Sequence, residues 1–209
     1  MDFQRKIYIN NKPLVLTNDA ESYQSQHNIA HGYLLLRGAF HRHFRLALKH
    51  LQKMRAVGAI IEDISPKALI DGLHEFYKPM DAAGGVVVNE NGDTLMIYRR
   101  GKWDLPKGKC EAEESISECA IREVMEETGL ERIELGKKLG ETFHIYEQGQ
   151  SKIIKRTVWF AMKADSRQQL LPQKEENIME VRWVSPDNID VVAFKSYEAI
   201  REVLRLNEQ

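Results

Sequence analysis

The stretch from Gly108 to Leu130 constrains this chain most, because it combines a well-marked helix with an unusual placement of acidic residues. Ser115 followed three residues later by Glu118 forms a capping-box pattern, which predicts that a helix begins there. Gly129 predicts its end, since glycine takes the left-handed conformation that closes many helices. Between these ends, apolar residues recur at helical spacing and define a core-facing stripe, made by Ile116, Cys119, Ala120 and Val124.

Two acidic side chains fall inside that apolar stripe. At about 100° per residue, Glu123 and Glu127 point within about 20° of Ile116, and Glu126 lies at the edge of the stripe. Carboxylates on an inward face repel one another and lose hydration, which is costly unless cations compensate. Oxygen ligands of this kind suit Mg²⁺ or Mn²⁺. The helix alone leaves two interpretations open, a metal site and a solvated glutamate-rich face.

The spacing of the whole stretch adds a resemblance to a known family. The stretch has the order glycine, five residues, glutamate, seven residues, Arg-Glu, an aliphatic residue, any residue, Glu-Glu, any residue, glycine and an aliphatic residue. This pattern resembles the Nudix box. A pattern with so many fixed positions is far more specific than a short motif. The positions are filled by Gly108, Glu114, Arg122, Glu123, Val124, Glu126, Glu127, Gly129 and Leu130. The resemblance does not extend to the first eighty residues.

The resemblance implies a Nudix-type mixed sheet between helices and a Mg²⁺- or Mn²⁺-dependent hydrolysis of a diphosphate linkage in a nucleoside diphosphate derivative. It implies that the metal is held by Glu123, Glu126 and Glu127, with a backbone carbonyl near Lys107 and Gly108. Bound metal ions would neutralise the phosphates and acidify the attacking water. The expected partner is therefore a small phosphorylated molecule, a nucleotide.

The remaining box residues support those carboxylates. Arg122 is expected to anchor the glutamates rather than to bind substrate, because its guanidinium can hold a carboxylate in two places. Glu114 is expected to act as an outer ligand or to orient the helix. The expected catalytic set is Glu123, Glu126, Arg122 and Glu114. The general base stays open between a box glutamate and a carboxylate from outside the box, for which Glu175, Glu176 and Glu180 are candidates; each also fits a plain acidic loop.

Residues outside the box suggest a substrate. The run from Trp103 to Gly108 resembles the run before the box in diadenosine polyphosphate and diphosphoinositol polyphosphate hydrolases. A tyrosine near the position of Tyr146 marks the dinucleoside polyphosphate group, where an aromatic ring can stack on a base. The expected substrate is then a dinucleoside polyphosphate, with sugar nucleotides and nucleoside triphosphates as alternatives. The expected substrate-binding residues are Lys107, Arg99, Arg100, Trp103 and Tyr146. In the competing interpretation, Tyr146 is a core residue and Lys107 a solvated loop charge.

The chain is expected to form two domains. Residues 1–78 carry their own strand and helix signals, including a hairpin turn at Asn10-Asn11 and a helix start at Ser65-Pro66, and predict a small α/β domain of unknown role. A boundary at Pro79–Ala83 precedes the Nudix domain, residues 79–209. The first domain is expected to cap the active site or to form a homodimer interface. A ligand-sensing Nudix module with an N-terminal effector or oligomerisation domain is the alternative, and the intact acids favour the enzyme.

Local signals divide the second domain further. Asn91-Gly92 predicts a hairpin, and residues 101–109 read as a loop. Two strands are expected at Glu141–Glu147 and Ile153–Lys163, and a short one at Val181–Val184. Ser185-Pro186 is expected to open a turn before a last helix at Ser196–Leu206.

Composition excludes several classes of function. The net charge is −1, so no basic field would attract DNA or an anionic membrane. The chain lacks an apolar run long enough to span a membrane, and its N-terminus lacks the apolar core of a signal peptide, which predicts a cytoplasmic protein. Its two cysteines, Cys110 and Cys119, are then expected to be reduced thiols.

Overall fold

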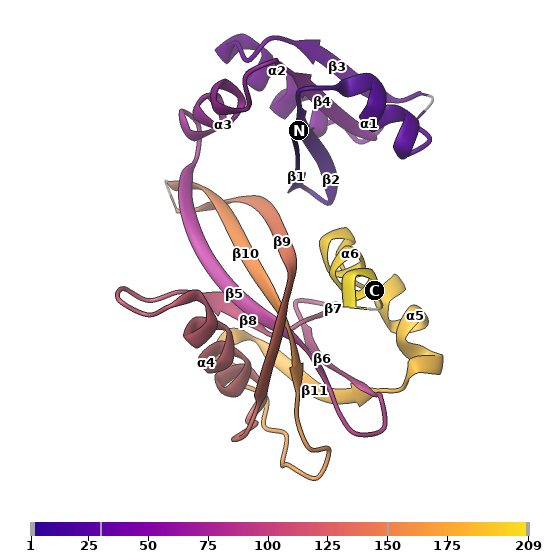
Figure 1. Cartoon of the computed structure of the whole chain (residues 1–209), viewed down its shortest axis with the longest axis vertical. Coiled ribbons are helices and arrows are strands. Elements are labelled where there is room, and N and C mark those ends of the chain that lie inside the picture. Colours follow the sequence, from indigo (N-terminus) through magenta and orange to yellow (C-terminus); the bar gives the residue numbers. More distant parts are fainter. Residues whose placement is uncertain (1–2, 30, 150, 208–209) are drawn as a thin grey trace. The chain divides into compact units, whose positions relative to one another are not determined.

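The computed structural model describes residues 3–29, 31–149 and 151–207, and the chain divides into two compact units (Figure 1). One unit takes in the chain up to Met80 together with Phe143–Lys155. The other takes in Asp81–Thr142 and the chain from Arg156 onward. The sequence suggested a division between 78 and 79; the units divide two residues later, and the first also includes a segment from far along the chain.

The first unit contains a hairpin followed by strands that alternate with helices. Its strand order is β9-β1-β2-β4-β3, in which β1 and β2 are antiparallel, whereas β1 with β9, β2 with β4 and β3 with β4 are parallel. Asn10 and Asn11 both have positive φ, 50° and 63°, as the predicted hairpin turn requires. The elements are β1 (Gln4–Ile9), β2 (Lys12–Thr17), α1 (Ala20–Gln26), β3 (Tyr33–Arg37), α2 (His41–Leu51), β4 (Gly58–Glu62) and α3 (Pro66–His74).

Helices cover both faces of this small sheet. Leu14 and Leu16 of β2 pack in one core with Phe44 of α2, whereas Val15 between them packs with Tyr23 of α1. This alternation is the period of two expected of a strand that is buried on both faces. Ile145 from the distant segment joins the core of Leu14, which explains why Phe143–Lys155 belongs to this unit.

The second unit is built on a larger sheet with the strand order β11-β6-β5-β10-β9, to which β7 adds on β6 and β8 adds on β5. Strands β9 and β10 also run into the first unit. The elements are β5 (Lys78–Val88), β6 (Thr94–Arg99), β7 (Lys102–Asp104), β8 (Lys107–Lys109), α4 (Ile116–Thr128), β9 (Glu134–Gln148), β10 (Ser151–Lys163), η1 (Lys174–Glu176), β11 (Ile178–Val184), α5 (Pro186–Phe194) and α6 (Glu198–Asn207).

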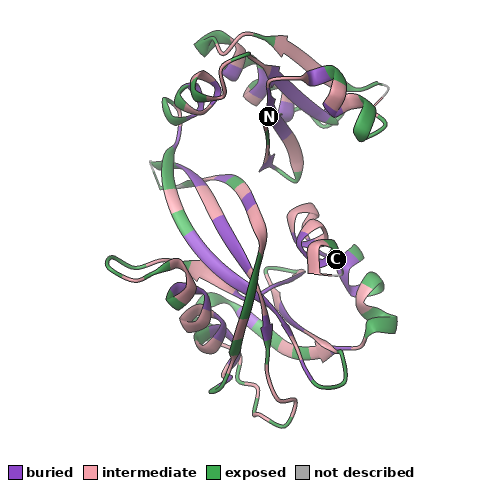
Figure 2. Ribbon diagram, viewed as in Figure 1, coloured by how far each residue is buried: buried purple, intermediate pink, exposed green. Residues whose placement is uncertain are grey.

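This sheet lies between α4 on one face and α5 with α6 on the other (Figure 1). Val87 and Leu95 pack in the core under α4, whereas their neighbours Val86 and Met96 pack in the core under α5 and α6. The strands are accordingly buried where the helices cover them (Figure 2). The predicted architecture, a mixed sheet between helices preceded by a smaller α/β region, is confirmed.

Several local predictions need correction. The two units divide between Met80 and Asp81, inside the expected boundary at Pro79–Ala83, but the chain does not break there: β5 continues through it, because Lys78 and Pro79 are exposed and the missing N–H of proline is tolerated. The expected loop 101–109 contains β7 and β8, which form by pairing with distant strands. The expected turn at Ser185-Pro186 is the start of α5, with Pro186 in its first turn, where proline costs no hydrogen bond.

Candidate active site

Helix α4 carries the acidic residues, and its ends are fixed by the residues that the sequence indicated. The Ser115 side chain accepts a hydrogen bond from the Glu118 backbone N–H, and the Glu118 side chain accepts one from the Ser115 N–H at 2.8 Å. Gly129 closes the helix with φ of 79°, in the left-handed region. The predicted helix start and end are confirmed. The caps fix where α4 begins and ends, and the packing of Cys119, Ala120 and Val124 in the core fixes its rotation and hence the direction of each glutamate.

The three glutamates of α4 differ sharply in their exposure. Glu127 is buried, with 1% of its surface exposed. The Glu123 side chain is 13% exposed and that of Glu126 is 48% exposed. The inward direction that helical spacing predicted for Glu123 and Glu127 therefore agrees with the structure, and Glu126 lies at the solvent edge.

Arg122 organises the outer part of the site. Its Nε and Nη2 atoms donate to the two carboxylate oxygens of Glu114 at 3.0 and 2.6 Å. Its Nη1 donates to Glu123 at 2.9 Å and to Glu126 at 3.1 Å. The hydrogen bonds that Arg122 donates to Glu114 raise the pKa of Arg122 above its ordinary value and lower the pKa of Glu114. One guanidinium thus links three carboxylates, as an anchor would.

Gly108 provides the surface on which Glu123 lies. It pairs with Ala83 in the short ladder between β8 and β5, which fixes its backbone against the sheet. A side chain at position 108 would collide with the Glu123 carboxylate, so only glycine lets the carboxylate approach the backbone this closely. The Glu123 carboxylate and the backbone of Gly108 therefore face the same small space.

The residues around this space fit a hard divalent cation. Carboxylate oxygens such as those of Glu123 are ligands that Mg²⁺ and Mn²⁺ prefer, and so are backbone carbonyls. Glu126 is half-exposed and can turn toward Glu123 by side-chain rotation. Both oxygens of Glu127 already accept a hydrogen bond, so metal binding there would use their remaining lone pairs.

Behind the glutamates lies a buried set of charges formed by Arg99, Asp104, Lys107 and Glu127, which we call the inner charge network. Arg99 donates through Nε to Asp104 at 3.1 Å and through Nη1 to Glu127 at 3.0 Å. Lys107 donates its ammonium to Asp104 at 2.6 Å and its backbone N–H to Glu127 at 2.8 Å. Lys107 is thus neither a solvated loop charge nor exposed, since its side chain is largely covered.

The inner charge network shifts the pKa values of its two carboxylates in opposite directions. Burial raises the pKa of Glu127 to about 7, against the opposing charges of Arg99 and Lys107. Burial acts in the same direction on Asp104, but the charges of Lys107 and Arg99 outweigh it and hold the pKa of Asp104 below its ordinary value. Asp104 is therefore ionised at neutral pH, whereas Glu127 gains or loses its proton near neutral pH.

The two cysteines overturn one prediction. Cys110 and Cys119 are joined in a disulfide instead of remaining reduced thiols. The loop after β8 folds back on α4 and brings their Cα atoms within 5.2 Å, a separation that a disulfide can bridge. Within the described ranges, Cys110, Glu114 and Cys119 are the one group of three potential ligands whose ligand atoms lie within 4.8 Å of one another, but sulfurs bonded to each other are not metal ligands.

The predicted substrate-binding residues lie in different settings. Arg100 is exposed in the turn between β6 and β7, where it adopts φ of 51°. Trp103 is buried, with its ring beside Tyr98 and under the guanidinium of Arg182, whose carbon lies 4.3 Å from the ring centre. Tyr146 belongs to the first unit, where its hydroxyl donates to the sulfur of Met80 at 3.3 Å.

Of the candidates for an external base, Glu176 has an electrostatic link to the inner charge network. Burial disfavours the charged form of Arg99, but nearby carboxylates, including Glu176, raise its pKa above its ordinary value. Glu175 is exposed on the same short helix, η1. Glu180 lies 3.4 Å from Arg182 in a surface ion pair.

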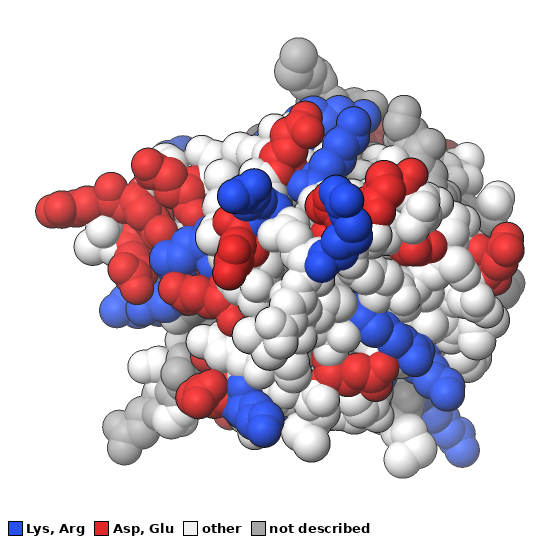
Figure 3. Space-filling model, turned by 90° about the horizontal axis from the view of Figure 1, so that it is seen from below, with Lys and Arg blue, Asp and Glu red and all other residues white. Residues whose placement is uncertain are grey.

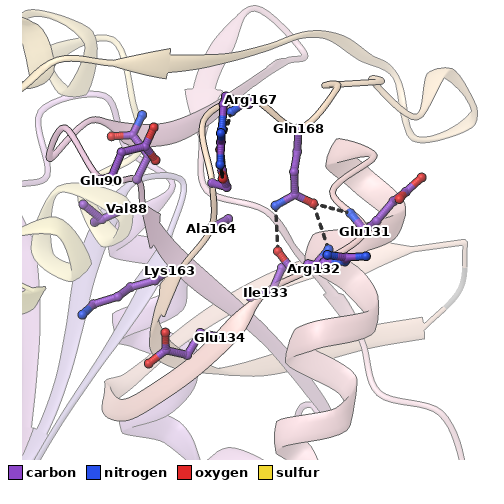
Figure 4. Close-up of a pocket in the computed structure, with 12 residues that line it drawn as sticks. Val88, Glu90, Glu131, Arg132, Ile133, Glu134, Lys163, Ala164, Arg167 and Gln168 are labelled. Atoms are coloured by element: carbon purple, nitrogen blue, oxygen red, sulfur yellow. Dashed lines mark hydrogen bonds and ion pairs between the residues drawn. The ribbon is translucent and has the colours of Figure 1, made fainter.

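A separate hollow of about 1640 Å³ lies in the second unit beside the ends of β5 and β10 (Figure 4). The polar groups that line it largely satisfy one another. Gln168 bonds the backbone of Glu131 and Arg132, and Arg167 pairs with Asp165 (Figure 4). The glutamates of the box do not line this hollow. It is therefore not the candidate active site, although it is large.

The surface shows no field of a single sign on the face drawn in Figure 3. Acidic side chains gather toward one edge, and basic ones are interspersed over the rest.

Across residues 3–29, 31–149 and 151–207, none of the helices has the length and apolar character needed to cross a bilayer.

Asp104 is the site residue that the sequence analysis missed. A signal was present, because an acidic residue stands between Trp103 and Leu105, both apolar. If such an acid is buried together with its apolar neighbours, its charge must be paired. The burial itself depends on the pairing of β7 with β6, which local sequence did not indicate.

Comparison with known proteins connects this geometry to a family. Residues 78–206 match the family profile described as NUDIX domain. A protein from Bacillus subtilis (strain 168) named putative 8-oxo-dGTP diphosphatase is 44% identical over 46 residues, which are 21% of this chain and 31% of that protein. A MutT-like protein from Streptomyces ambofaciens is 31% identical over 110 residues, 52% of this chain and 65% of that protein.

This chain therefore spans less than two thirds of the length of either curated relative. Among solved structures, a MutT protein from Methanosarcina mazei Go1 has 25% sequence identity and a TM-score of 0.48, with 63% of this chain and 95% of that one covered. The family profile matches more than half of the chain, which confirms the resemblance drawn from the box residues: this protein belongs to the Nudix family.

Proposed function

We propose that this protein hydrolyses a diphosphate linkage in a nucleoside phosphate, with Mg²⁺ or Mn²⁺ as cofactor. The observation that carries the proposal is the position of Glu123 against Gly108, with Glu126 at the solvent edge beside it. Oxygen donors gathered at an accessible edge of a capped helix suit a cation that must also meet a polyanionic substrate.

Each residue then has a defined task. A divalent ion held there supplies charge neutralisation of the phosphates and acidification of a water molecule. Glu123, Glu126 and Glu127 offer carboxylate oxygens, and Gly108 offers its carbonyl. Arg122 holds the carboxylates of Glu123 and Glu126 in position and is itself held by both oxygens of Glu114. Glu176, exposed and electrostatically linked to Arg99, joins the box glutamates as a candidate proton acceptor.

For the substrate we propose a dinucleoside polyphosphate. The support is the run from Trp103 to Gly108, which resembles that of dinucleoside polyphosphate hydrolases, and the exposed Arg100, whose guanidinium is available to phosphate oxygens. Tyr146 is proposed as a residue that stacks on a base.

A nucleoside triphosphate is the second candidate. The observation that favours it is the name of the Bacillus subtilis relative, a putative 8-oxo-dGTP diphosphatase, which is similar over 46 residues. Both candidates contain the phosphoanhydride that the proposed reaction cleaves. They differ in whether a second base stands at the far end of the phosphate chain.

A substrate panel tests the proposal. Purified protein with Mg²⁺ receives diadenosine tetraphosphate, dGTP, 8-oxo-dGTP or ADP-ribose, and products are separated by anion exchange. Hydrolysis of an anhydride bond in at least one compound supports the proposed function, and the highest kcat/KM for diadenosine tetraphosphate supports the substrate. If none of the compounds is hydrolysed but one binds tightly, the result would contradict the proposed enzyme and favour a ligand-sensing module.

A further inference from the structure

Asp104 is the buried acid that joins the two cations of the inner charge network. It accepts hydrogen bonds from Arg99, from the Lys107 ammonium and from the Leu105 backbone N–H, at 3.1, 2.6 and 2.9 Å. It is 2% exposed, so these partners replace the water that its charge would otherwise need. A buried charge that loses its partner is strongly destabilising, which makes the arrangement hard to vary.

Both partners of Asp104 also hold Glu127. Arg99 uses one edge of its guanidinium for Asp104 and another nitrogen for Glu127, 3.0 Å away. Lys107 uses its side chain for Asp104 and its backbone N–H for Glu127, 2.8 Å away. Asp104 and Glu127 are therefore connected twice, once through a side chain and once through the backbone that leads directly into Gly108.

Each cation of this network faces the network's own acids. Two cations face two acids, and both cationic side chains are largely covered. An arginine and a lysine that are already bound to buried carboxylates have little capacity left for phosphate groups. Their position favours a role in holding the protein's own acids over a role in gripping the substrate.

We propose that Asp104 is a positioning residue, which fixes Arg99 and Lys107 so that Glu127 and the backbone at Gly108 are held in place for the metal. This inference rests on the proposed function, and it assigns Arg99 and Lys107 to the support of the site. Loss of a residue that supports metal ligands weakens metal affinity or activity by about 10–100-fold.

The test compares Asp104→Asn, Asp104→Glu and the matched control Asp190→Asn, which removes an exposed acid of α5. Mn²⁺ binding to the free protein is measured by electron paramagnetic resonance without substrate. Asp104→Asn is expected to raise the Kd for Mn²⁺ by about 10–100-fold and to lower kcat with little change in the KM of the substrate. Asp104→Glu is expected to recover part of the affinity, and Asp190→Asn to match the wild type.

Other outcomes would overturn the inference. An unchanged Kd for Mn²⁺ in folded Asp104→Asn, with only a lower melting temperature, would make Asp104 a purely structural residue. Because the Mn²⁺ measurement needs no substrate, it still tests the inference if wild-type protein hydrolyses none of the panel, an outcome that counts against the proposed function alone.

Lys107→Met provides a second variant if Asp104→Asn fails to fold. It removes the ammonium but keeps the backbone N–H that holds Glu127 and most of the apolar stem. Equal losses of kcat/KM on diphosphate and tetraphosphate substrates are expected for a positioning role. A larger loss on the tetraphosphate, through KM, would show that Lys107 contacts phosphate and would overturn the assignment.

Discussion

Glu123 lies against Gly108, in space that any side chain at position 108 would occupy. The contact joins a residue of α4 to a residue of β8, and β8 is fixed by its pairing with β5. The backbone of β8 at Gly108 and the Glu123 carboxylate of α4 are therefore in contact. The proposed metal site depends on this contact.

Gly108→Ala is expected to displace the Glu123 carboxylate while the fold persists. Misplacement of a catalytic group by about 1 Å can cost about 100-fold in rate, and we expect a loss of kcat/KM of that order. The measurement is kcat/KM at saturating Mg²⁺, with circular dichroism to confirm folding. The matched control is Gly140→Ala, whose added methyl group meets the flexible end of Leu206 at 3.0 Å. Equal losses in both variants would contradict the steric argument.

Acid is expected to weaken the second unit through Glu141. Arg156 donates to both oxygens of Glu141, at 2.9 and 2.7 Å, and this lowers the pKa of Glu141 from an ordinary 4.5 to about 2. Because the pKa is lower in the folded protein, the stabilisation is present above pH 4.5 and is lost as the pH falls from there toward 2. Solvent screens the partly exposed pair, so we expect about 1 kcal/mol.

Urea unfolding at pH 6 and pH 3 measures this contribution. Glu141→Gln should be less stable than the wild type at pH 6, and the difference should shrink at pH 3. Glu134→Gln, which changes an exposed acid of the same strand, should show no such dependence. A difference that grows toward pH 3 would have the wrong sign for a lowered pKa.

The disulfide between Cys110 and Cys119 is expected to stabilise the folded chain. It closes a loop with a sequence separation of 9, for which restriction of the unfolded chain predicts about 2–3 kcal/mol. Dithiothreitol should lower the free energy of unfolding by that amount, and the Cys110→Ser, Cys119→Ser double variant should not respond to it. Two titratable thiols in unfolded protein prepared without reductant would argue against the bond.

Local signals predicted the centre of the site, and contacts between distant residues decided the rest. The ends of α4 are set by Ser115, Glu118 and Gly129, which all lie in or next to the helix itself. The helical period then directs Glu123 and Glu127 inward. Asp104 acquires its role only because β7 pairs with β6, which brings it beside Arg99. The disulfide likewise depends on how the loop before α4 folds back, which spacing along the chain does not determine.

The division of the chain was harder to predict for a similar reason. Pro79 suggested a break, yet β5 continues through it on an exposed stretch. The segment Phe143–Lys155 lies within the sequence of the second domain, but Ile145 and Ile154 pack in the core of the first unit. The packing of these two side chains shows that the segment belongs to the core of the first unit.

The dependence of hydrolysis on a divalent cation tests the central claim most directly. Activity on the best substrate of the panel is measured with Mg²⁺, with excess chelator, and after Mg²⁺ is restored. The same assay is run on Glu123→Gln and on the exposed control Glu131→Gln. We expect activity to vanish with chelator, to return with Mg²⁺, and to fall by about 100-fold in Glu123→Gln alone, as for a displaced catalytic group. Full activity in excess chelator, or in Glu123→Gln, would contradict the account.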